Sequence, residues 1–356
     1  MSCESRGFVR LAVAHVRNEL GGAAKTLVFD VPPSQAERFR WRPGQHVTPR
    51  VHLDGEELRR SYSISSSPYG DEGLRITVKR VAGGRVSNFI NDRIEAGHEL
   101  EVMPPFGGFC LDPGLRLRRT HYFFGAGSGI TPLYSMLHSV LEAEPYSVAH
   151  LIFGNTNADT ILFRDALDAL RAAHPRRLTV SHVLSSPSMG SSVSPWRTGR
   201  LDARSIEAVF AEHPPYAQDT QYYVCGPGDM NAAVRGALMG LDVPQSRIHE
   251  ESYGGAIEED RSIEGIAATA RVLLAGREHT VPIAAGQTVL QAVRSASLTP
   301  PFSCQSGVCG ACRGHLREGH VHLRARMALE DSELERGAIL TCQAVPTTPS
   351  LSVVYD

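Results

Sequence analysis

The sequence lacks any long run of apolar residues. No stretch reaches the roughly eighteen consecutive apolar side chains that a membrane-spanning helix needs. The first residues, Met1–Gly7, also lack the basic segment and apolar run of a secretory signal. We therefore expect a cytoplasmic protein that does not cross a membrane.

An excess of charge of one sign is also missing. The 356 residues include 36 lysines and arginines against 38 aspartates and glutamates, a formal net charge of −2. Such a balance provides no general attraction to nucleic acid or to an anionic membrane surface, and we expect neither as a partner. The length of the chain and its hydrophobic content of 42% predict two or three globular domains.

Cysteine is scarce, and its number is odd. Only seven occur, and Cys3, Cys110 and Cys225 lie far from the other four. A chain of this size does not need disulfides to stabilise its cores. This distribution argues against a disulfide framework and fits a reducing compartment. The remaining four cysteines need a different explanation.

Three of these four cysteines lie within nine residues near the C-terminus, spaced Cys304-x4-Cys309-x2-Cys312, and Cys342 follows a predicted helix over Ala328–Glu335. Four thiolates at this spacing are typical of a plant-type [2Fe–2S] cluster. Zinc is the alternative, although zinc sites usually present two Cys-x2-Cys pairs. Four of the residues between these ligands are small: Ser306, Gly307, Gly310 and Ala311. Their size lets backbone N–H groups approach the inorganic sulfides of the cluster.

The first third of the chain alternates polar and apolar residues between turns, which predicts an antiparallel barrel or sandwich. The expected strands are Leu11–Val16, Ala24–Val31, Gln45–Leu53, Leu58–Ser65, Leu74–Val81 and Glu99–Met103.

From Thr120 the pattern changes to alternating apolar strands and helices, which predicts a parallel α/β sheet. The expected elements are Thr120–Gly125, Pro132–Ala143, Ser147–Phe153, Leu162–Ala173 and Thr179–Leu184. The charged stretch Glu258–Gly265 has no periodicity and is expected to be a linker. A hairpin (Ala270–Leu274 and His279–Pro282) and a helix (Thr288–Ser297) are expected after it.

One motif series in the barrel region has the chemistry of a flavin site. Arg60-Ser61-Tyr62-Ser63 offers a charge for phosphate, an aromatic ring for stacking and a hydroxyl for a ring nitrogen. A strand and the glycine turn Gly83–Asn88 follow, and the turn opens a helix whose first amides suit a pyrophosphate. Alone, Arg-x-Tyr-Ser also fits an ordinary strand. In this order the series resembles the flavin-binding domain of the ferredoxin–NADP reductase superfamily.

The resemblance implies FAD as the flavin. It also implies these contacts: Arg60 at the flavin phosphates, Ser61 within the same motif, Tyr62 on the isoalloxazine, Ser63 beside N5, Val78 and Lys79 on the next strand, and Gly84, Val86 and Ser87 around the pyrophosphate.

The α/β region carries two further motifs. A buried strand leads into Gly125-Ala-Gly-Ser-Gly-Ile-Thr-Pro132, where Thr131 is expected as the helix N-cap and Pro132 as the first helical residue. No acid for a ribose follows the second strand, so the ordinary dinucleotide rule is not met. Cys225 alone would be a small buried side chain. Within Cys225-Gly-Pro-x-x-Met230 it belongs to a pattern that, with the glycine loop, resembles the pyridine-nucleotide domain of the same superfamily.

This second resemblance implies that NADH or NADPH binds to the chain. It also implies a hydride-transfer site whose catalytic residues are Ser63, Cys225 and Glu251. Neither Gly154–Ala158 nor Leu184–Pro187 offers a base for a 2′-phosphate, which favours NADH, although Arg164 and Arg200 leave NADPH open. Glu251 and Tyr253 also fit the end of a surface strand. The implied nucleotide contacts are Gly125, Gly127, Ser128, Gly129, Ile130, Thr131, Pro132, Cys225, Gly226, Pro227 and Met230, with Tyr253 returning toward the flavin.

The C-terminal segment resembles a plant-type ferredoxin. The expected fold is therefore multidomain: an antiparallel β-barrel for FAD (1–112), an α/β parallel-sheet domain for NAD(P) (113–257), a linker (258–267) and a β-grasp [2Fe–2S] domain (268–356) whose metal ligands are Cys304, Cys309, Cys312 and Cys342.

The domain order and motifs most resemble reductase components of the phenylacetyl-CoA epoxidase and 3-ketosteroid 9α-hydroxylase type. This implies transfer from NAD(P)H through FAD and [2Fe–2S] to a partner oxygenase or hydroxylase, because a flavin accepts an electron pair and releases it singly. Two alternatives stay open: a diaphorase-type reductase of a small acceptor, and a non-catalytic electron carrier.

Overall fold

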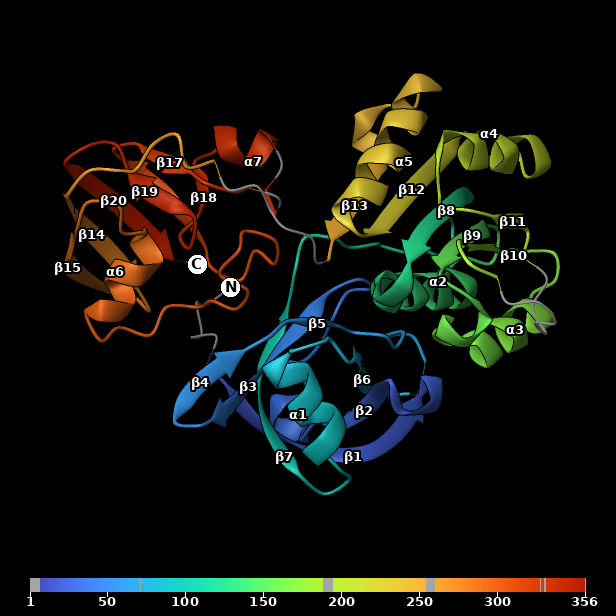
Figure 1. Cartoon of the computed structure of the whole chain (residues 1–356), viewed down its shortest axis with the longest axis horizontal. Helices are drawn as coiled ribbons and strands as arrows, with labels where there is room; N and C mark the ends of the chain where they lie inside the picture. Colours follow the sequence, from blue (N-terminus) through green and yellow to red (C-terminus); the bar gives the residue numbers. More distant parts are fainter. Residues whose placement is uncertain are drawn as a thin grey trace.

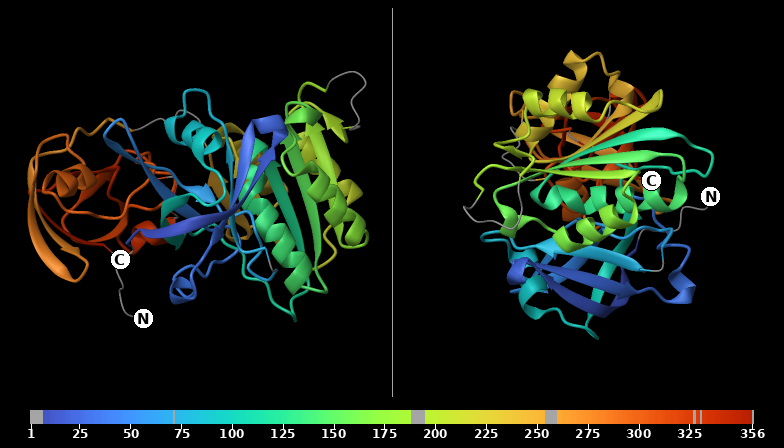
Figure 2. Two further views of the ribbon diagram at one scale, coloured as in Figure 1. Left: turned by 90° about the horizontal axis from the view of Figure 1, so that it is seen from below. Right: turned by 90° about the vertical axis from the view of Figure 1, so that its right-hand side faces the viewer.

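A computed structural model gives the structure of the chain and describes residues 7–70, 72–187, 195–253, 260–326, 328–329 and 331–355. Three lobes are visible, with the barrel between the parallel-sheet domain and the C-terminal domain in the left view of Figure 2 (Figures 1 and 2). Among the described helices none is long and apolar enough to span a membrane. Residues 258 and 259 of the expected linker lie outside the described residues.

The N-terminal lobe is a closed antiparallel barrel, as expected. Its strand order is β4-β3-β7-β1-β2-β6, and β5 pairs with β3 while Ile64 bridges Ile76 of β6, which closes the sheet. Inward-facing apolar residues form one core. The elements are β1 (Val9–Glu19), β2 (Ala24–Asp30), β3 (His46–Leu53), β4 (Glu56–Arg59), β5 (Tyr62–Ser63), β6 (Leu74–Lys79), α1 (Arg85–Arg93) and β7 (Glu99–Phe106), with 3₁₀ turns at Leu20–Gly22 and Pro33–Gln35.

The single strand expected over Leu58–Ser65 is wrong, because β4 and β5 are separate. The break lies opposite Pro49 of β3. The amide of Arg60 donates to the carbonyl of Pro49 at 3.3 Å, but proline has no N–H to return the bond. The ladder is therefore interrupted within the Arg60–Ser63 motif.

The second domain is a parallel α/β sheet, which confirms the expected class. All pairs in the order β11-β10-β9-β8-β12-β13 are parallel. The elements are β8 (Arg119–Ala126), α2 (Ile130–Ala143), β9 (Val148–Asn155), α3 (Arg164–Ala173), β10 (Leu178–Leu184), β11 (Arg197–Thr198), α4 (Ala203–Glu212), β12 (Asp219–Gly226), α5 (Gly228–Gly240) and β13 (Ile248–Ser252), with 3₁₀ turns at Gly127–Gly129, Ala158–Thr160 and Gln245–Arg247.

The start of α2 differs from the expectation. Thr131 is not the N-cap, because the 3₁₀ turn Gly127–Gly129 runs directly into the helix and Gly129 takes the capping position. The hydroxyl of Thr131 instead donates to the carbonyl of Ser128 at 2.9 Å. The helix therefore begins closer to the glycine loop than the sequence suggests.

The C-terminal domain has the expected β-grasp arrangement, a mixed sheet with one helix packed on it. The sheet order is β15-β14-β20-β16-β18, with β14 and β20 parallel and the other neighbours antiparallel. The elements are β14 (Ala268–Leu274), β15 (Arg277–Ile283), α6 (Val289–Ser295), β16 (Arg313–Glu318), β17 (Val321–Leu323), α7 (Asp331–Glu335), β18 (Ala338–Leu340), β19 (Ala344–Pro346) and β20 (Ser350–Tyr355).

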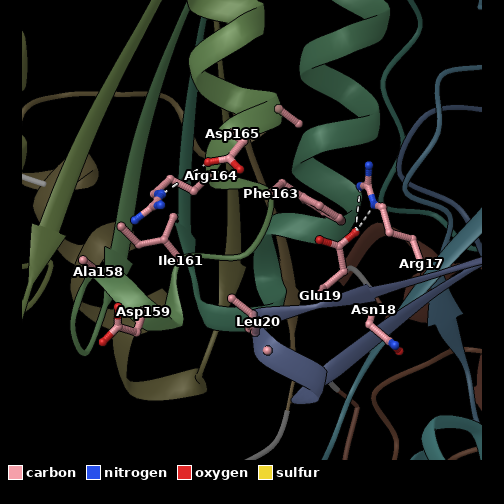
Figure 3. A pocket seen from close by; sticks show the side chains of 12 residues that line it. Arg17, Asn18, Glu19, Leu20, Ala158, Asp159, Ile161, Phe163, Arg164 and Asp165 are labelled. Carbon is pink, nitrogen blue, oxygen red and sulfur yellow. Dashed lines mark hydrogen bonds and ion pairs between the residues drawn. The ribbon is translucent and has the colours of Figure 1, made fainter. Parts of the chain in front are cut away.

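The contacts that hold the barrel against the parallel-sheet domain include a hydrophobic one and a polar one. In the first, Leu20 and Ala24 at the end of the β1–β2 hairpin pack on the core of the parallel-sheet domain. In the second, Ser135 on α2 donates to the carbonyl of Ser66 at 2.6 Å, and Ser139 donates to Ser67 at 3.1 Å. A cavity of about 550 Å³ lies beside the hairpin (Figure 3).

Candidate active site

The parallel register brings three of the expected site residues into one row. Gly125 at the end of β8 lies opposite Cys225 of β12, and Cys225 lies opposite Glu251 of β13. All three are at the carboxyl ends of their strands, the edge where open α/β sheets bind ligands.

The glycine loop packs directly on the strand that carries Cys225. A Cβ on Gly129 would lie 2.0 Å from the carbonyl oxygen of Cys225, and one on Gly226 would lie 2.6 Å from the methyl carbon of Met230. Gly127 has a φ of +54°, in the left-handed region. The close packing leaves the amide end of α2 at the sheet edge, an arrangement that suits a phosphate.

A hydrogen-bond chain joins the barrel to this sheet edge. Ser63 of β5 donates to the hydroxyl of Tyr253, which donates to the carboxylate of Glu251. The amide of Tyr253 also donates to the carbonyl of Gly226 at 3.1 Å. Ser63, expected at the flavin, therefore lies close to Glu251, expected at the hydride-transfer site, although the two are far apart in the sequence.

Desolvation dominates the protonation of this cluster. It raises the pKa of Glu251 to about 7, against the opposing hydrogen bonds from Tyr253 and Ser63. It also raises the pKa of the Cys225 thiol, and the nearby Glu251 carboxylate acts in the same direction. Glu251 is thus able to hold or release a proton near neutral pH, whereas Cys225 stays a neutral thiol.

The residues expected at the flavin differ in the exposure of their side chains. Arg60 is exposed and Tyr62 is half-buried, so both side chains are accessible from outside the barrel core. The side chain of Val78, by contrast, is wholly buried in the barrel core, because alternate residues of β6 face inward. Of the expected pair on this strand, only Lys79 reaches the surface.

The glycine turn before α1 leads into a tightly packed helix start. Gly84 is the N-cap, and its Cβ would lie 2.5 Å from the hydroxyl oxygen of Ser87. Ser87 accepts a hydrogen bond from the amide of Val81 at 3.3 Å. Val86 packs its side chain into the barrel core, so it contributes a backbone amide. The first amides of the helix therefore suit a pyrophosphate.

The four clustered cysteines are arranged as two pairs. Cys304 contacts Cys309, and Cys312 contacts Cys342. Backbone amides also point at the sulfurs: Ser306 donates to Cys304 at 3.4 Å, and Cys304 donates to Cys309 at 3.5 Å. Two thiol pairs provide two protein ligands for each iron of a [2Fe–2S] cluster, so the donor set fits that group.

Three domain families match the chain in this order. Residues 12–110 match the oxidoreductase FAD-binding domain, residues 123–236 the oxidoreductase NAD-binding domain, and residues 272–347 the 2Fe-2S iron-sulfur cluster binding domain. A component protein of 1,2-phenylacetyl-CoA epoxidase from Escherichia coli is 33% identical, with 98% of each chain covered. The chain belongs to the family of three-domain oxygenase reductases.

Other members of the family are similarly close. The ferredoxin reductase component of 3-ketosteroid-9-alpha-monooxygenase from Mycobacterium tuberculosis is 36% identical over 98% of this reductase and 96% of its own length. The reductase subunit of glycine betaine monooxygenase from Pseudomonas aeruginosa is 30% identical over 86% of both chains. The solved structure of phthalate dioxygenase reductase shares the fold, with a TM-score of 0.59 and 23% identity over 98% of both chains.

These matches define the chemistry of the chain. It is an NAD(P)H-dependent flavin and iron–sulfur oxidoreductase whose cofactors are FAD and a [2Fe–2S] cluster. Bound FAD supplies the conversion between electron pairs and single electrons.

One residue near the site was missed from the sequence. His46 of β3 lies opposite Ser63 and is 4% exposed. Burial lowers its pKa to about 4, so the ring is neutral. With Glu251 and Cys309 it lines a cavity of about 870 Å³ between the sheet edge and the cluster loop. A single histidine in a strand belongs to no motif, so the sequence does not indicate that it lines a cavity beside the site.

Replacing Gly129 with alanine should weaken nicotinamide binding at least tenfold, because the added methyl group would collide with the carbonyl of Cys225. The measurement is the Kd for the nucleotide, from flavin absorbance in the protein that retains FAD and cluster. Gly236→Ala, outside both nucleotide motifs, is the matched control, since nothing lies within 4 Å of its added Cβ. Equal Kd values for Gly129→Ala and the wild type would contradict the assignment.

Glu251→Gln should remove a pH dependence of stability. The folded pKa of about 7 lies above the ordinary value of 4.5, so the wild type loses stability as pH rises through 7 and the carboxyl becomes charged. From pH 6 to pH 8 its free energy of unfolding should fall by about 1 kcal/mol relative to that of Glu251→Gln. Denaturant titrations at both pH values measure this, with the exposed Glu37→Gln as control. Parallel pH curves for all three proteins would refute the shifted pKa.

Proposed function

We propose that this reductase accepts hydride from NADH and delivers single electrons, through FAD and the [2Fe–2S] cluster, to a separate oxygenase component. The observation that supports this most is the meeting of the flavin motif and the row of Gly125, Cys225 and Glu251 at one hydrogen-bond chain. The named relatives that cover nearly the whole chain serve an epoxidase and a monooxygenase.

Three residues carry the reaction in this proposal. The Ser63 hydroxyl is placed to hydrogen-bond the flavin ring where hydride arrives, and the Cys225 thiol packs against the nicotinamide. Hydride transfer from NADH to the flavin needs no proton, but one is released when the reduced flavin gives up its two electrons. Glu251, whose pKa is near 7, would accept that proton, because a group with a pKa near the working pH does this most effectively. Tyr253, which joins Ser63 to Glu251, lies on the flavin side of the site.

Cofactor binding is assigned to the surrounding backbone and side chains. Bound FAD takes its phosphates at Arg60 and the amides of the Gly84–Ser87 turn, with Tyr62 on the ring. The glycine loop before α2 holds the nicotinamide nucleotide. The [2Fe–2S] ligands are Cys304, Cys309, Cys312 and Cys342, in the two pairs that the fold provides.

We place the domain boundaries at 112/113, 257/258 and 267/268 and the protein in the cytoplasm. Separate hydrophobic cores in the barrel, the parallel-sheet domain and the C-terminal domain support the division. Phe109 and Leu111 pack with the second core, so the first boundary follows a segment shared by two domains. A reducing compartment keeps the cluster thiols free of disulfides.

Cys309→Ser should block output to protein acceptors while sparing the flavin reaction. Loss of one thiolate removes or disables the cluster, whereas ferricyanide takes electrons from the flavin directly. We expect NADH-dependent reduction of ferricyanide within about twofold of wild type and reduction of a [2Fe–2S]-dependent acceptor, such as a purified oxygenase component, to fall at least a hundredfold. Cys110→Ser is the control. Retained transfer to the oxygenase would contradict output through the cluster.

NADH should be preferred over NADPH by at least tenfold in kcat/KM. The end of β9 and the turn after it contain Asn155, Thr156 and Asn157 rather than a base. The two candidate bases form only exposed surface pairs, Arg164 with Asp165 at 3.5 Å and Arg200 with Asp229 at 3.6 Å. Steady-state kinetics with both nucleotides measures the ratio. A preference for NADPH would show that one of these arginines leaves its partner and binds the 2′-phosphate.

A further inference from the structure

The two residues that precede Cys304 dock the cluster loop on the barrel. Phe302 and Ser303 are 5% and 1% exposed. The guanidinium carbon of Arg59 in β4 lies 3.9 Å from the centre of the Phe302 ring, and Ser61 donates to the hydroxyl of Ser303 at 3.0 Å. Figure 1 shows β3, β4 and β5 on the side of the barrel that faces the C-terminal domain.

Arg59 is held in place from the barrel side. It is 7% exposed, and Glu57 pairs with it at 2.7 Å. The ring of Phe8 lies 4.8 Å from the same guanidinium carbon. Desolvation lowers the pKa of Arg59 while Glu57 opposes the change. A buried, ion-paired guanidinium beside an aromatic ring forms a directional contact that a lysine does not reproduce.

Phe302 is contacted by a cation from each domain. Arg294 of α6 places its guanidinium carbon 4.2 Å from the centre of the ring, in addition to Arg59 from the barrel. The ring therefore contacts a guanidinium of both domains. The hydroxyl of Thr48 extends the polar part of the contact, 3.0 Å from that of Ser61.

The contact connects the two redox motifs through neighbouring residues. Ser61 precedes Tyr62 of the flavin motif, and Ser303 precedes the cluster ligand Cys304. One hydrogen bond of 3.0 Å thus bridges them. We name four residues the docking contact: Arg59, Ser61, Phe302 and Ser303.

We propose that the docking contact positions the cluster loop for electron transfer from the flavin, an inference that rests on the proposed function. Electron tunnelling slows steeply with distance, and a linker alone leaves a tethered domain free to sample many positions. The docking contact selects one of them. Val308, Cys309 and Gly310 on the same loop line the cavity described above, so docking does not bury the whole loop.

The test is a double-mutant cycle in the full-length protein with FAD and cluster bound. Arg59→Ala and Phe302→Leu, one from each domain, should leave NADH reduction of the flavin within twofold of wild type. Each should slow the following reduction of the cluster at least tenfold in anaerobic stopped-flow absorbance. The double variant should be no slower than the single variants, because both remove the same contact.

Two further variants separate the effect of charge from that of stacking. Arg59→Lys should restore little of the rate, since it keeps the charge but not the planar stacking. Arg271→Ala is the matched control, an exposed arginine of the C-terminal domain that pairs with Glu318. It should react like the wild type. Rates of cluster reduction within twofold of wild type in both Arg59→Ala and Phe302→Leu, or slowing that multiplies in the double variant, would overturn the proposal.

Hydrogen exchange provides a readout that does not depend on turnover. Amides of β4 and of residues 300–304 should exchange faster in Arg59→Ala and Phe302→Leu than in the wild type and in Arg271→Ala. Unchanged exchange would contradict docking through these residues. The wild-type reaction reports separately on the proposed function: a cluster that NADH never reduces would contradict that function, while the exchange data still test the docking contact.

Discussion

The hydrogen-bond chain from Ser63 through Tyr253 to Glu251 is the contact on which the rest of the site depends. It joins the barrel to the carboxyl edge of the parallel sheet, where the register already aligns Glu251 with Cys225. Because hydride transfer requires two rings in direct contact, the domains that hold them must meet with little freedom. The serine contacts of α2 and the packed β1–β2 hairpin fix the same interface from a second side.

The chemistry of the carriers explains why three domains share one chain. A nicotinamide delivers two electrons together, whereas an iron–sulfur cluster takes one at a time, so a flavin has to stand between them. The barrel, which holds the flavin motif, contacts both other domains. Ser63 contacts the parallel-sheet domain and Ser61 contacts the C-terminal domain. Two residues of one short motif thus face the input and the output.

Local patterns predicted most of this fold and pointed to residues that the fold brings close together. The cysteine spacing, the glycine loop and the order of strands and helices each depend on neighbouring residues, and the aligned row of Gly125, Cys225 and Glu251 follows from parallel pairing at one sheet edge. The misses depend on tertiary contacts. Pro49 interrupts β4 and β5 from another strand. The pairing of Arg59 with Phe302 joins two different domains and has no local signal.

Electrons enter this reductase as hydride at the flavin and leave singly through the cluster in the function proposed above. The most direct measurement is anaerobic mixing of the wild-type protein with NADH, followed by flavin absorbance and by electron paramagnetic resonance of rapidly frozen samples. We predict loss of oxidised flavin absorbance first and then the axial-type signal of a reduced [2Fe–2S] cluster. Flavin reduction with no cluster signal, or cluster reduction while the flavin stays oxidised, would contradict it.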